Sequence, residues 1–377
     1  MHPTHALLTC KKRGWAGEAT ITAAVARGLA ERGHRVTVAA NPEARIIDRL
    51  EGSGVEILRL TLLKERPQVA WTLPRDMRRL AHYVREQGVA LIHSNASFDT
   101  WTAALARRLH GLRLPLLRTK HNLKEIRETR TNRWYYGPGI DHLVVPSRAV
   151  ETVLRRCPLI ANEKIHRIPN GISLDPARLF QKGKAQARAE LGIPAEAEVV
   201  AYISRLTRRK DPATFLRAAL RVASERPGLR ILVVGTGEPA VASRLEALAA
   251  GSPQVEVLGH RDDVPRLLAA TDVFVLPSLI EPFGLAPLEA MLQGVTTIVS
   301  DAEGFQDFAR HEENALIFPK GDVAALSSAI ARALSDPALR ARLATEGEKT
   351  VREFFHTDRM IDDLESLYER VLGQARR

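Results

Sequence analysis

Short apolar runs alternate with longer amphipathic segments along the whole chain. The runs have the length of buried strands, and the longer segments carry apolar residues three or four positions apart, the spacing of a helix with one buried face. Residues 20–32 show this helical spacing at Ile21, Val25 and Leu29, and Gly33 follows where the helix should end. Such an alternation predicts mainly parallel sheets with helices on both faces.

The first half of the chain follows this pattern throughout. Strands are predicted at Ala6–Thr9, Arg35–Ala40, Val55–Leu60, Leu91–His93, Leu114–Thr119 and Leu143–Pro146, and helices at Thr20–Arg32, Asp76–Glu86 and Thr100–Leu109. Turn residues then interrupt the pattern at Ile168-Pro169-Asn170-Gly171-Ile172. The break predicts a connection between two domains near Pro169–Pro176.

The second half restarts the alternation after about residue 194. Strands are predicted at Val199–Ser204, Arg230–Gly235, Val255–Leu258, Val273–Pro277 and Thr297–Ser300, and helices at Pro212–Ser224, Ala240–Ala250, Val264–Ala270, Pro287–Gln293, Val323–Ser335 and from about Ala338 onward. We therefore expect an α/β protein with a first domain at 1–168, a second at 169–350, and a terminal helix at 351–377 that packs back on the first. Ligands of such sheets bind beyond the carboxyl ends of the strands.

Composition excludes several classes of protein. Hydrophobic residues make up 45% of the 377 positions and charged residues 26%, so the chain can bury sizeable cores and is not disordered as a whole. The two cysteines, Cys10 and Cys157, belong to no Cys/His cluster, which argues against a disulfide scaffold or a zinc site. The apolar run at residues 6–10 precedes its charges, unlike a signal peptide, and no run reaches membrane-spanning length. A cytoplasmic protein is expected.

The net charge of +11 is concentrated in the first half. Residues 1–175 hold 29 Lys+Arg against 16 Asp+Glu, while the remainder is slightly acidic. The densest segment, Arg118–Tyr136, ends in Trp134-Tyr135-Tyr136 and contains the cations Arg118, Lys120, Lys124, Arg127, Arg130 and Arg133. This combination predicts contact with an anionic membrane surface, at the inner face of the cytoplasmic membrane. The alternative is a solvated helix whose aromatic residues pack inward.

The glycine-rich segments can be compared with two phosphate-binding motifs, the dinucleotide fingerprint and the P-loop. Gly235-Thr236-Gly237, with Ala240 in third place, satisfies a dinucleotide fingerprint formally, but no acidic ribose ligand follows at the required distance. No Gly-x-x-x-x-Gly-Lys-Ser/Thr segment occurs, which excludes a P-loop nucleotidase. A tight turn between strand and helix accounts for the glycines equally well.

The segment from Pro277 to Met291 is the most informative in the chain. It places two carboxylates, Glu281 and Glu289, eight positions apart around Gly284 and the helix-starting Pro287. Carboxylates accept hydrogen bonds from vicinal hydroxyls, and the backbone amides at a helix start attract an anion. The segment therefore suits a sugar attached to a nucleoside diphosphate. For Glu289 alone, an acidic first turn that stabilises the helix dipole is the simpler explanation.

Two cations follow another strand of the same domain. Arg205 and Lys210 come directly after the strand Val199–Ser204, so they lie at the same type of sheet edge as the two glutamates. Cations there would stabilise the charge that develops on a departing diphosphate. Arg208 and Arg209, between them, are interpreted as a solvated basic loop.

Taken in order, these segments resemble the retaining GT-B glycosyltransferases of glycosyltransferase family 4, and the resemblance covers nearly the whole chain. Besides the paired glutamates, the matching motifs are Gly14-Trp15-Ala16-Gly17-Glu18, His121-Asn122, Val145-Pro146-Ser147, Ile168-Pro169-Asn170-Gly171-Ile172, Ser204-Arg205-Leu206 with Lys210, and Val234-Gly235-Thr236-Gly237-Glu238-Pro239. The resemblance implies a GT-B fold, with two doubly wound Rossmann-like domains facing a central cleft, the first on the acceptor side and the second holding the donor.

The resemblance also implies roles for individual residues. It implies four catalytic residues. Arg205 and Lys210 would contact the donor diphosphate, Glu281 would contact the donor-sugar hydroxyls, and His121 would lie beside the donor sugar. It also implies that the donor is bound by Gly14, Gly17, Gly237, Phe283, Gly284, Leu285 and Glu289, of which Glu289 would contact the ribose. A lone histidine at a strand end is more often structural, so the role of His121 rests mainly on the resemblance.

The sequence departs from the family pattern at three places. Trp15 and Ala16 separate the first-loop glycines, which are usually adjacent, and Ser173 replaces the usual Asp after Asn-Gly-Ile. The family's Gly-Gly-x-Pro-Glu reads Glu303-Gly304-Phe305-Gln306-Asp307. Because this last loop often shapes the donor or acceptor pocket, the identity of the sugar is left open.

The expected function is a hexosyltransferase-type reaction that retains anomeric configuration. A nucleotide-diphosphate sugar would donate its sugar to a glycan or lipid-linked acceptor, and the expected role of this transfer is polysaccharide or lipopolysaccharide synthesis in the cell envelope. No Asp-x-Asp motif is present, so neither a metal nor another cofactor is expected. A nucleotide-sugar epimerase of the same fold is one alternative. A nucleic-acid-binding protein is another, disfavoured because aromatic residues make up only 5%.

Overall fold

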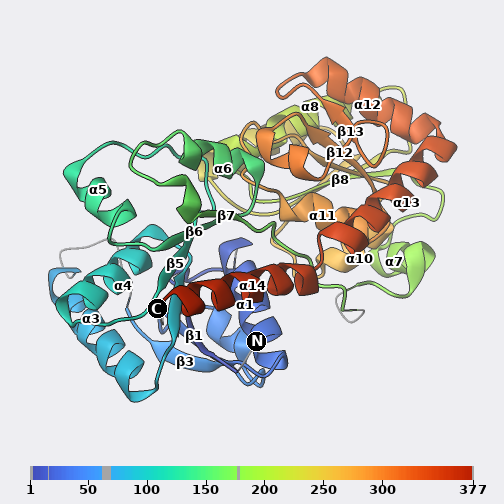
Figure 1. Ribbon diagram of the computed structural model, residues 1–377. Helices are drawn as coiled ribbons and strands as arrows, with labels where there is room; N and C mark the ends of the chain where they lie inside the picture. The colour runs from blue at the N-terminus through green and yellow to red at the C-terminus, as the bar shows by residue number, and fades with distance from the viewer. Residues whose placement is uncertain (1–2, 16, 62–68, 176–178, 376–377) are drawn as a thin grey trace. The chain divides into compact units, whose positions relative to one another are not determined.

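The computed structural model describes residues 3–15, 17–61, 69–175 and 179–375, which fold into two compact α/β units (Figure 1). Unit 1 comprises residues 1–171 and 357–377, and unit 2 comprises residues 172–356. The chain thus passes between the units after residues 171 and 356 instead of the expected 168 and 350. A backbone hydrogen bond joins the two crossing segments, because the amide of Ile172 donates to the carbonyl of Phe355 (2.8 Å). This bond holds both residues in unit 2 and so sets the two boundaries. Pro176 lies outside the described residues.

Unit 1 is built on a seven-stranded parallel sheet with the order β3-β2-β1-β4-β5-β6-β7. Its strands are β1 (His5–Cys10), β2 (Arg35–Ala40), β3 (Glu56–Arg59), β4 (Leu91–Ser94), β5 (Leu116–Thr119), β6 (His142–Val145) and β7 (Ile165–Arg167). Its helices are α1 (Gly17–Glu31), α2 (Ile46–Leu50), α3 (Val69–Glu86), α4 (Ser97–Leu109), α5 (Arg130–Tyr136), α6 (Arg148–Arg155) and α14 (Thr357–Ala375), with a 3-10 turn at Asn162–Lys164. The order reverses between β1 and β4, which makes their carboxyl ends the place for a ligand.

Unit 2 repeats the architecture with a six-stranded parallel sheet in the order β10-β9-β8-β11-β12-β13. Its strands are β8 (Val199–Ile203), β9 (Arg230–Val234), β10 (Val255–Gly259), β11 (Val273–Leu276), β12 (Thr296–Ser300) and β13 (Leu316–Phe318). Its helices are α7 (Gly183–Leu191), α8 (Pro212–Ala223), α9 (Pro239–Ala249), α10 (Val264–Ala270), α11 (Leu285–Leu292), α12 (Val323–Ser335) and α13 (Pro337–Phe354), with 3-10 turns at Arg208–Lys210 and Glu303–Asp307. Here the order reverses between β8 and β11.

The predicted fold class is confirmed, and the differences concern short elements. The sequence analysis missed strands β7 and β13 and helices α2 and α6, because three to eight residues carry too little periodicity. Helix α3 begins before Pro74 instead of after it, and α11 begins at Leu285, two residues before the expected Pro287. The terminal helix begins at Thr357, six residues later than predicted.

Helix α14 belongs to unit 1 and packs against α1, beside which it lies in Figure 1. The two helices approach closely at Gly28, where an added Cβ would stand 2.8 Å from a side-chain carbon of Ile361. Polar contacts continue the interface: Glu365 accepts from His34 (2.8 Å), and the hydroxyl of Tyr368 bonds Nδ1 of His93 (2.6 Å). The expectation that the terminal helix packs on the first domain therefore has a direct physical basis.

Acid should lower the free energy of unfolding by protonating His93, which contacts α14 and is 3% exposed. Burial, and secondarily His121, lowers the pKa of His93 to about 3. Since the unfolded chain binds the proton with a pKa of about 6.5, the stability from neutral His93 is full above that pH and is lost as the pH falls toward 3. Between pH 7 and pH 5 we expect this residue alone to cost about 2 kcal/mol of unfolding free energy.

Urea unfolding of the wild type and of His93→Gln at both pH values measures this effect. The variant should lose about 2 kcal/mol less on acidification than the wild type. His82→Gln is the matched control, because the side chain of His82 is 77% exposed. Equal acid sensitivity of His93→Gln and the wild type would contradict the assignment.

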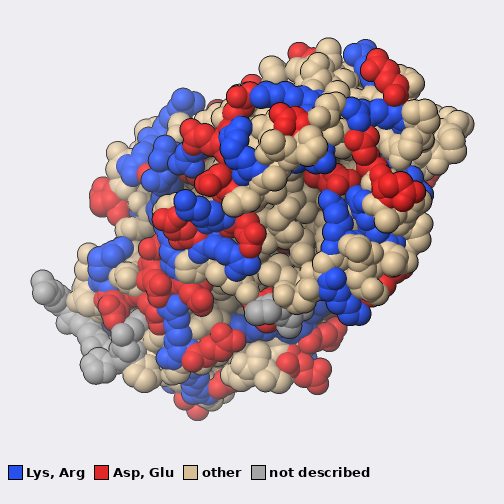
Figure 2. All heavy atoms as spheres, turned by 90° about the vertical axis from the view of Figure 1, so that its right-hand side faces the viewer, with Lys and Arg blue, Asp and Glu red and all other residues tan. Residues whose placement is uncertain are grey.

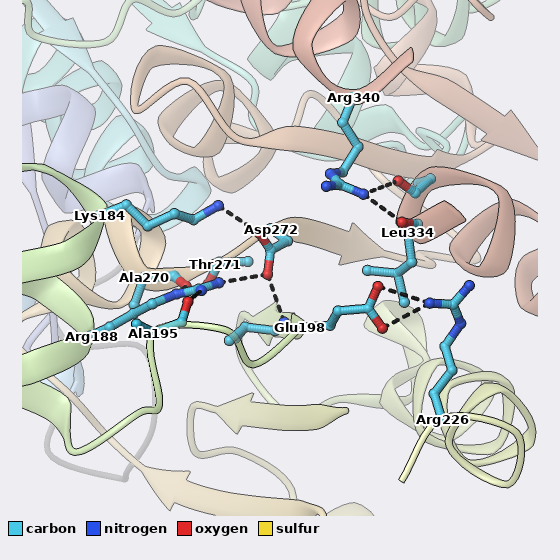
Figure 3. A network of polar contacts seen from close by, with 12 residues as sticks. Lys184, Arg188, Ala195, Glu198, Arg226, Ala270, Thr271, Asp272, Leu334 and Arg340 are labelled. Carbon is cyan, nitrogen blue, oxygen red and sulfur yellow. Dashed lines mark hydrogen bonds and ion pairs between the residues drawn. The ribbon is translucent and has the colours of Figure 1, made fainter. Parts of the chain in front are cut away.

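The amino ends of β8 and β11 in unit 2 are held by a partly buried ionic network around Asp272 (Figure 3). Its carboxylate accepts from Lys184 (2.6 Å), from Arg188 (2.7 Å) and from the backbone amide of Val199 (2.7 Å). The network ties α7 to the start of β8 and β11. Because it lies at the amino ends of these strands, its role is structural, and the opposite edge of the sheet is left for a ligand.

In the segment Arg118–Tyr136 only Arg130–Tyr136 is helical, and its aromatic residues pack inward as in the alternative described above. Tyr135 and Tyr136 are buried, and the ring of Trp134 stacks on Trp101 at a centroid distance of 5.5 Å. Arg118 is 3% exposed and donates to both tyrosine hydroxyls (3.0 Å each). The rings of Tyr135 and Tyr136 are therefore part of the core of unit 1 and do not reach lipid head groups, whereas Trp134 is only partly buried.

The charges on the visible surface are mixed in sign. On the face shown in Figure 2, Lys and Arg side chains are interspersed with Asp and Glu. None of the helices that the structure describes is both long enough and apolar enough to cross a bilayer.

Candidate functional site

The loop after β8 presents Arg205 and Lys210 at the carboxyl edge of the sheet in unit 2. The buried Tyr202 donates from its hydroxyl to the carbonyl of Arg205 (2.9 Å), which fixes the backbone while the guanidinium stays exposed. Within the described ranges no hydrogen bond or ion pair engages the Arg205 side chain. An exposed cation held on an ordered backbone is ready to bind an anion.

Lys210 and Glu281 form an ion pair that joins the loops after β8 and β11. Both side chains are mostly buried, at 16% and 7% exposure. The same carboxylate oxygen of Glu281 accepts from Ser278 (3.2 Å), whose own carbonyl accepts from Ser300 (2.6 Å). Glu281 is therefore held in one orientation, and Ser278 is a supporting residue that the sequence analysis did not identify.

Helix α11 begins beside this pair and carries Glu289. Gly284 precedes the helix with a φ of +103°, a conformation that side chains other than glycine rarely adopt. The Glu289 carboxyl has no hydrogen-bond or ion-pair partner among the described residues, and its burial raises its pKa. Vicinal hydroxyls of a ribose would supply the missing hydrogen bonds and stabilise the carboxylate form.

Gly235 and Gly237 serve the packing of two loops at this edge. A Cβ on Gly235 would stand 1.9 Å from the carbonyl of Ser204, and one on Gly237 would stand 2.1 Å from the carbonyl of Leu206. Backbone hydrogen bonds join the loops at this close approach, from Leu206 to Thr236 (3.0 Å) among others. These contacts give both glycines a structural reason, whereas the donor-binding role of Gly237 stays a prediction.

The loop that departs from the family pattern contacts the loop after β11 directly. A Cβ on Gly304 would stand 2.2 Å from the carbonyl of Glu281, and the ring of Phe305 covers Gly284. Glu303, at the start of the loop, pairs with Lys320 (2.9 Å). Phe283 is 3% exposed and packs with Phe308 and Phe355, so its side chain belongs to the core of unit 2.

His121 follows β5 at the carboxyl edge of the sheet in unit 1. Its Nε2 lies 3.4 Å from the amide oxygen of Asn95, which follows β4. The loop after His121 is anchored by Lys120, whose ammonium donates to the carbonyls of Asn122 (2.5 Å) and Lys124 (2.8 Å). Burial lowers the pKa of Lys120 to about 8.

A pair of carboxylates lies near the same edge of unit 1. Asp99 is fully satisfied, with Thr9 donating from its hydroxyl (2.5 Å) and Ala96 and Thr100 donating from their amides. Glu18, by contrast, has an enclosed oxygen, Oε1, without a partner in the described part of the chain. Burial and the charge of Asp99 raise the pKa of Glu18 to about 7.

The predicted site residues fall into two groups. Arg205, Lys210, Glu281, Phe283, Gly284, Leu285 and Glu289 lie in the loops after β8 and β11 or at the start of α11, at one edge of unit 2. His121, Gly14 and Gly17 belong to unit 1, where the loop glycines precede and begin α1. Ala16, between them, lies outside the described residues. Asn95 and Ser278 were missed because their partners are distant in sequence.

Two family models match successive parts of the chain. The model described as "Glycosyltransferase Family 4" matches residues 15–176, and the model described as "Glycosyl transferases group 1" matches residues 183–350. The two matches together cover the greater part of both units.

The curated relatives that match this chain include several glycosyltransferases. The chain is 36% identical over 178 residues to the lipopolysaccharide core biosynthesis glycosyltransferase LpsE of Rhizobium meliloti, and the match covers 46% of this chain and 51% of that protein. It is 29% identical over 313 residues to the D-inositol 3-phosphate glycosyltransferase of Saccharomonospora viridis, covering 76% and 71%. The chain thus spans about half the length of the first relative and about 70% of the second.

Solved structures match over the full length of the chain. A glycosyltransferase from Rickettsia africae superposes with a TM-score of 0.85 at 17% identity, covering 99% of both chains. Anabaena HepE, in complex with UDP and glucose, superposes with a TM-score of 0.83 at 19% identity, covering 97% of this chain and 100% of that one. At these identities the likeness concerns the fold.

Proposed function

We propose, from the premise that this chain belongs to glycosyltransferase family 4 and has the GT-B fold, that it transfers a sugar from a nucleoside-diphosphate sugar to a hydroxylated acceptor. The observation that carries the proposal is the set of unpartnered side chains of opposite sign at one edge of unit 2. The Arg205 guanidinium and the Glu289 carboxylate each lack a protein partner among the described residues, and a nucleoside diphosphate would satisfy both. HepE, which shares the fold, was crystallised with UDP.

The mechanism that we propose divides the work between these side chains. Arg205 and Lys210 would stabilise the negative charge that develops on the leaving diphosphate, with the amides at the start of α11. Glu281, held by Lys210 and Ser278, would accept hydrogen bonds from the donor-sugar hydroxyls and fix the sugar for transfer. Glu289 would bind the ribose.

We further propose that transfer retains the anomeric configuration and needs no divalent metal, since protein cations occupy the place where charge develops. The anomeric configuration of the product, determined by NMR of the purified glycoside, tests the first statement. Transfer in the presence of a chelator tests the second, because a metal-dependent reaction would stop. An epimerase would convert the nucleotide sugar without forming a glycoside, so the same product analysis distinguishes that alternative.

Replacing Glu289 or Glu281 by Ala should have different effects on the binding of the free nucleoside diphosphate. Glu289→Ala should weaken binding of the free nucleoside diphosphate, because the ribose loses its hydrogen-bond acceptor. Glu281→Ala should leave that binding nearly intact and impair transfer, because the sugar is the only part of the donor that Glu281 is expected to contact. Isothermal titration with UDP, GDP and ADP measures the first effect, and product formation measures the second. Equal loss of diphosphate affinity in both variants would refute the assignment.

The acceptor that we propose is a glycan or a lipid-linked saccharide of the cell envelope. The support comes from the relatives, which include two lipopolysaccharide core glycosyltransferases of Rhizobium meliloti and a galactosyltransferase of Escherichia coli whose name specifies a diphosphoundecaprenol-linked substrate. Incubation of the protein and a nucleotide sugar with such lipid-linked saccharides, and with their delipidated forms, tests the acceptor class.

Contact with an anionic membrane surface stays a prediction that now depends on four cations. Lys124, Arg127, Arg130 and Arg133 are exposed around α5, whereas the rings of Tyr135 and Tyr136 are buried. At about 1 kcal/mol for each cation near the surface, replacing any one by Gln should weaken vesicle binding about fivefold. Co-sedimentation with anionic vesicles at low and high salt measures this. Equal binding to neutral vesicles, or no binding at low salt, would contradict the prediction.

A further inference from the structure

Asn95 joins the ends of three neighbouring strands in unit 1. It follows β4, which pairs with β1 on one side and with β5 on the other. Toward β1, its amide nitrogen Nδ2 donates to the carbonyl of Thr9 (3.1 Å). Toward β5, its amide oxygen Oδ1 lies 3.4 Å from Nε2 of His121. The residue is 7% exposed, so both contacts are largely shielded from water.

The chemistry of these contacts fixes which atom of the amide faces which neighbour. A backbone carbonyl only accepts hydrogen bonds, so the NH₂ group of Asn95 must face Thr9. The amide oxygen then faces His121, and because this oxygen also only accepts, Nε2 of His121 must carry a hydrogen and donate it. The fixed carbonyl of Thr9 therefore determines the tautomer of a histidine two strands away.

His121 carries only one ring hydrogen at neutral pH. Burial, together with the positive charges of Arg118 and Lys12, lowers its pKa to about 4. With the hydrogen on Nε2, the other ring nitrogen, Nδ1, holds a free lone pair. Among the residues that the structure describes, none donates a hydrogen bond to Nδ1.

We propose that Asn95 is a positioning residue that holds His121 as its Nε2–H tautomer, so that Nδ1 accepts a hydrogen bond from a hydroxyl group of the substrate. The inference rests on the proposed function, because a sugar-transfer reaction supplies a hydroxylated substrate. An accepting nitrogen selects a hydroxyl and disfavours a phosphate oxygen, which also only accepts. The bare Nδ1 is therefore suited to a hydroxyl group of the substrate and not to a phosphate oxygen.

The tautomer is directly measurable in the full chain without any substrate. We expect the ¹⁵N NMR spectrum of the histidine-labelled protein at pH 7 to show His121 with Nε2 protonated and Nδ1 bare, with His121→Gln identifying the signals. Asn95→Ala should remove the preference and populate both tautomers. Asn95→Asp keeps an acceptor toward His121, so it should preserve the tautomer, and its negative charge should raise the pKa of His121. It also loses the donor to the Thr9 carbonyl, so we expect this variant to be less stable than the wild type. A wild-type His121 protonated on Nδ1, or an unchanged tautomer in Asn95→Ala, would overturn the proposal.

Asn41 offers a matched control on the same sheet. It follows β2, is 2% exposed, and donates from Nδ2 to the carbonyl of Thr61 (2.7 Å). Asn41→Ala therefore removes an equally buried amide with no contact to His121, and it should leave the His121 tautomer unchanged. A tautomer change in this variant would show that the effect follows general destabilisation and not the Asn95 contact.

Transfer kinetics connect the tautomer to the reaction. We expect Asn95→Ala to lower kcat/KM for the nucleotide sugar about tenfold, while the Kd of the free nucleoside diphosphate stays unchanged. In Asn95→Asp, kcat/KM should recover most of this loss at a pH above the raised pKa of His121. A loss of diphosphate affinity equal to the loss in kcat/KM would overturn the assignment to the sugar. A wild type without transferase activity but with the expected tautomer would refute the proposed function alone.

Discussion

Arg205→Ala is expected to lower the rate of sugar transfer by roughly 10²–10³-fold, the usual effect of removing one group that stabilises charge in a transition state. The proposed reaction leaves one additional negative charge on the departing diphosphate, and Arg205 is an exposed cation on a backbone fixed by Tyr202. Since the side chain makes no ion pair within the described residues, its removal should not change the free energy of unfolding by more than about 0.5 kcal/mol.

Arg208→Ala is the matched control for this experiment. Arg208 lies three residues further along the same loop, is also exposed and makes no ion pair in the described part of the chain. Because the sequence assigns it to the solvated part of the loop, its replacement should leave the transfer rate within about twofold of the wild type. Equal losses in both variants would show that the loop contributes only general positive charge, and wild-type transfer by Arg205→Ala would remove that residue from the mechanism.

Lys210 and Glu281 should behave as one unit in both stability and catalysis. Removing either partner leaves the other as an uncompensated buried charge, which typically costs about 3–5 kcal/mol of stability. Each single alanine variant should also lose about 10²-fold or more in transfer, because the pair fixes the sugar and stabilises the diphosphate. The double alanine variant should be no slower than the worse single variant, since residues that share one interaction are not additive.

A hydrophobic replacement separates the structural and the chemical roles of this pair. Lys210→Met combined with Glu281→Leu removes both charges and fills their volume, so stability should return to within about 1–2 kcal/mol of the wild type. Transfer should remain low, because Met and Leu cannot replace the lost cation and hydrogen-bond acceptor. Recovery of transfer together with stability would show that the ion pair only holds the loops together.

The sequence predicted the long elements, and placed the proposed donor-side residues at one sheet edge, because both signals are local. Helical spacing at Ile21, Val25 and Leu29 predicted α1, and the motif around Glu281 and Glu289 placed both carboxylates within one strand-loop-helix segment. The edge strands β7 and β13 were missed because each contains only three residues. Their pairing depends on a neighbouring strand that is far away in the sequence.

Burial was the property that local patterns predicted least well. Arg118 and Tyr135 looked like parts of an exposed basic and aromatic surface, but the tyrosine hydroxyls accept from the guanidinium inside unit 1. Asn95 and Ser278 carried no motif, because their importance comes from partners at the ends of other strands. Gly304 shows the opposite case: the loop sequence departs from the family pattern, and yet its glycine stands where the backbone of Glu281 requires one.

Thermal unfolding in the presence of nucleotides tests the central claim most directly. A ligand that binds only the folded protein raises its stability by about 2.7 kcal/mol at a concentration one hundred times Kd. We predict that at least one of UDP, GDP and ADP, and a sugar conjugate of the same base, raises the melting temperature of the wild type. The same nucleotide should have no effect on a variant that combines Arg205→Ala with Glu289→Ala. A wild type whose melting temperature responds to none of these nucleotides, or a double variant that responds like the wild type, would contradict a nucleotide-sugar site at this edge of unit 2.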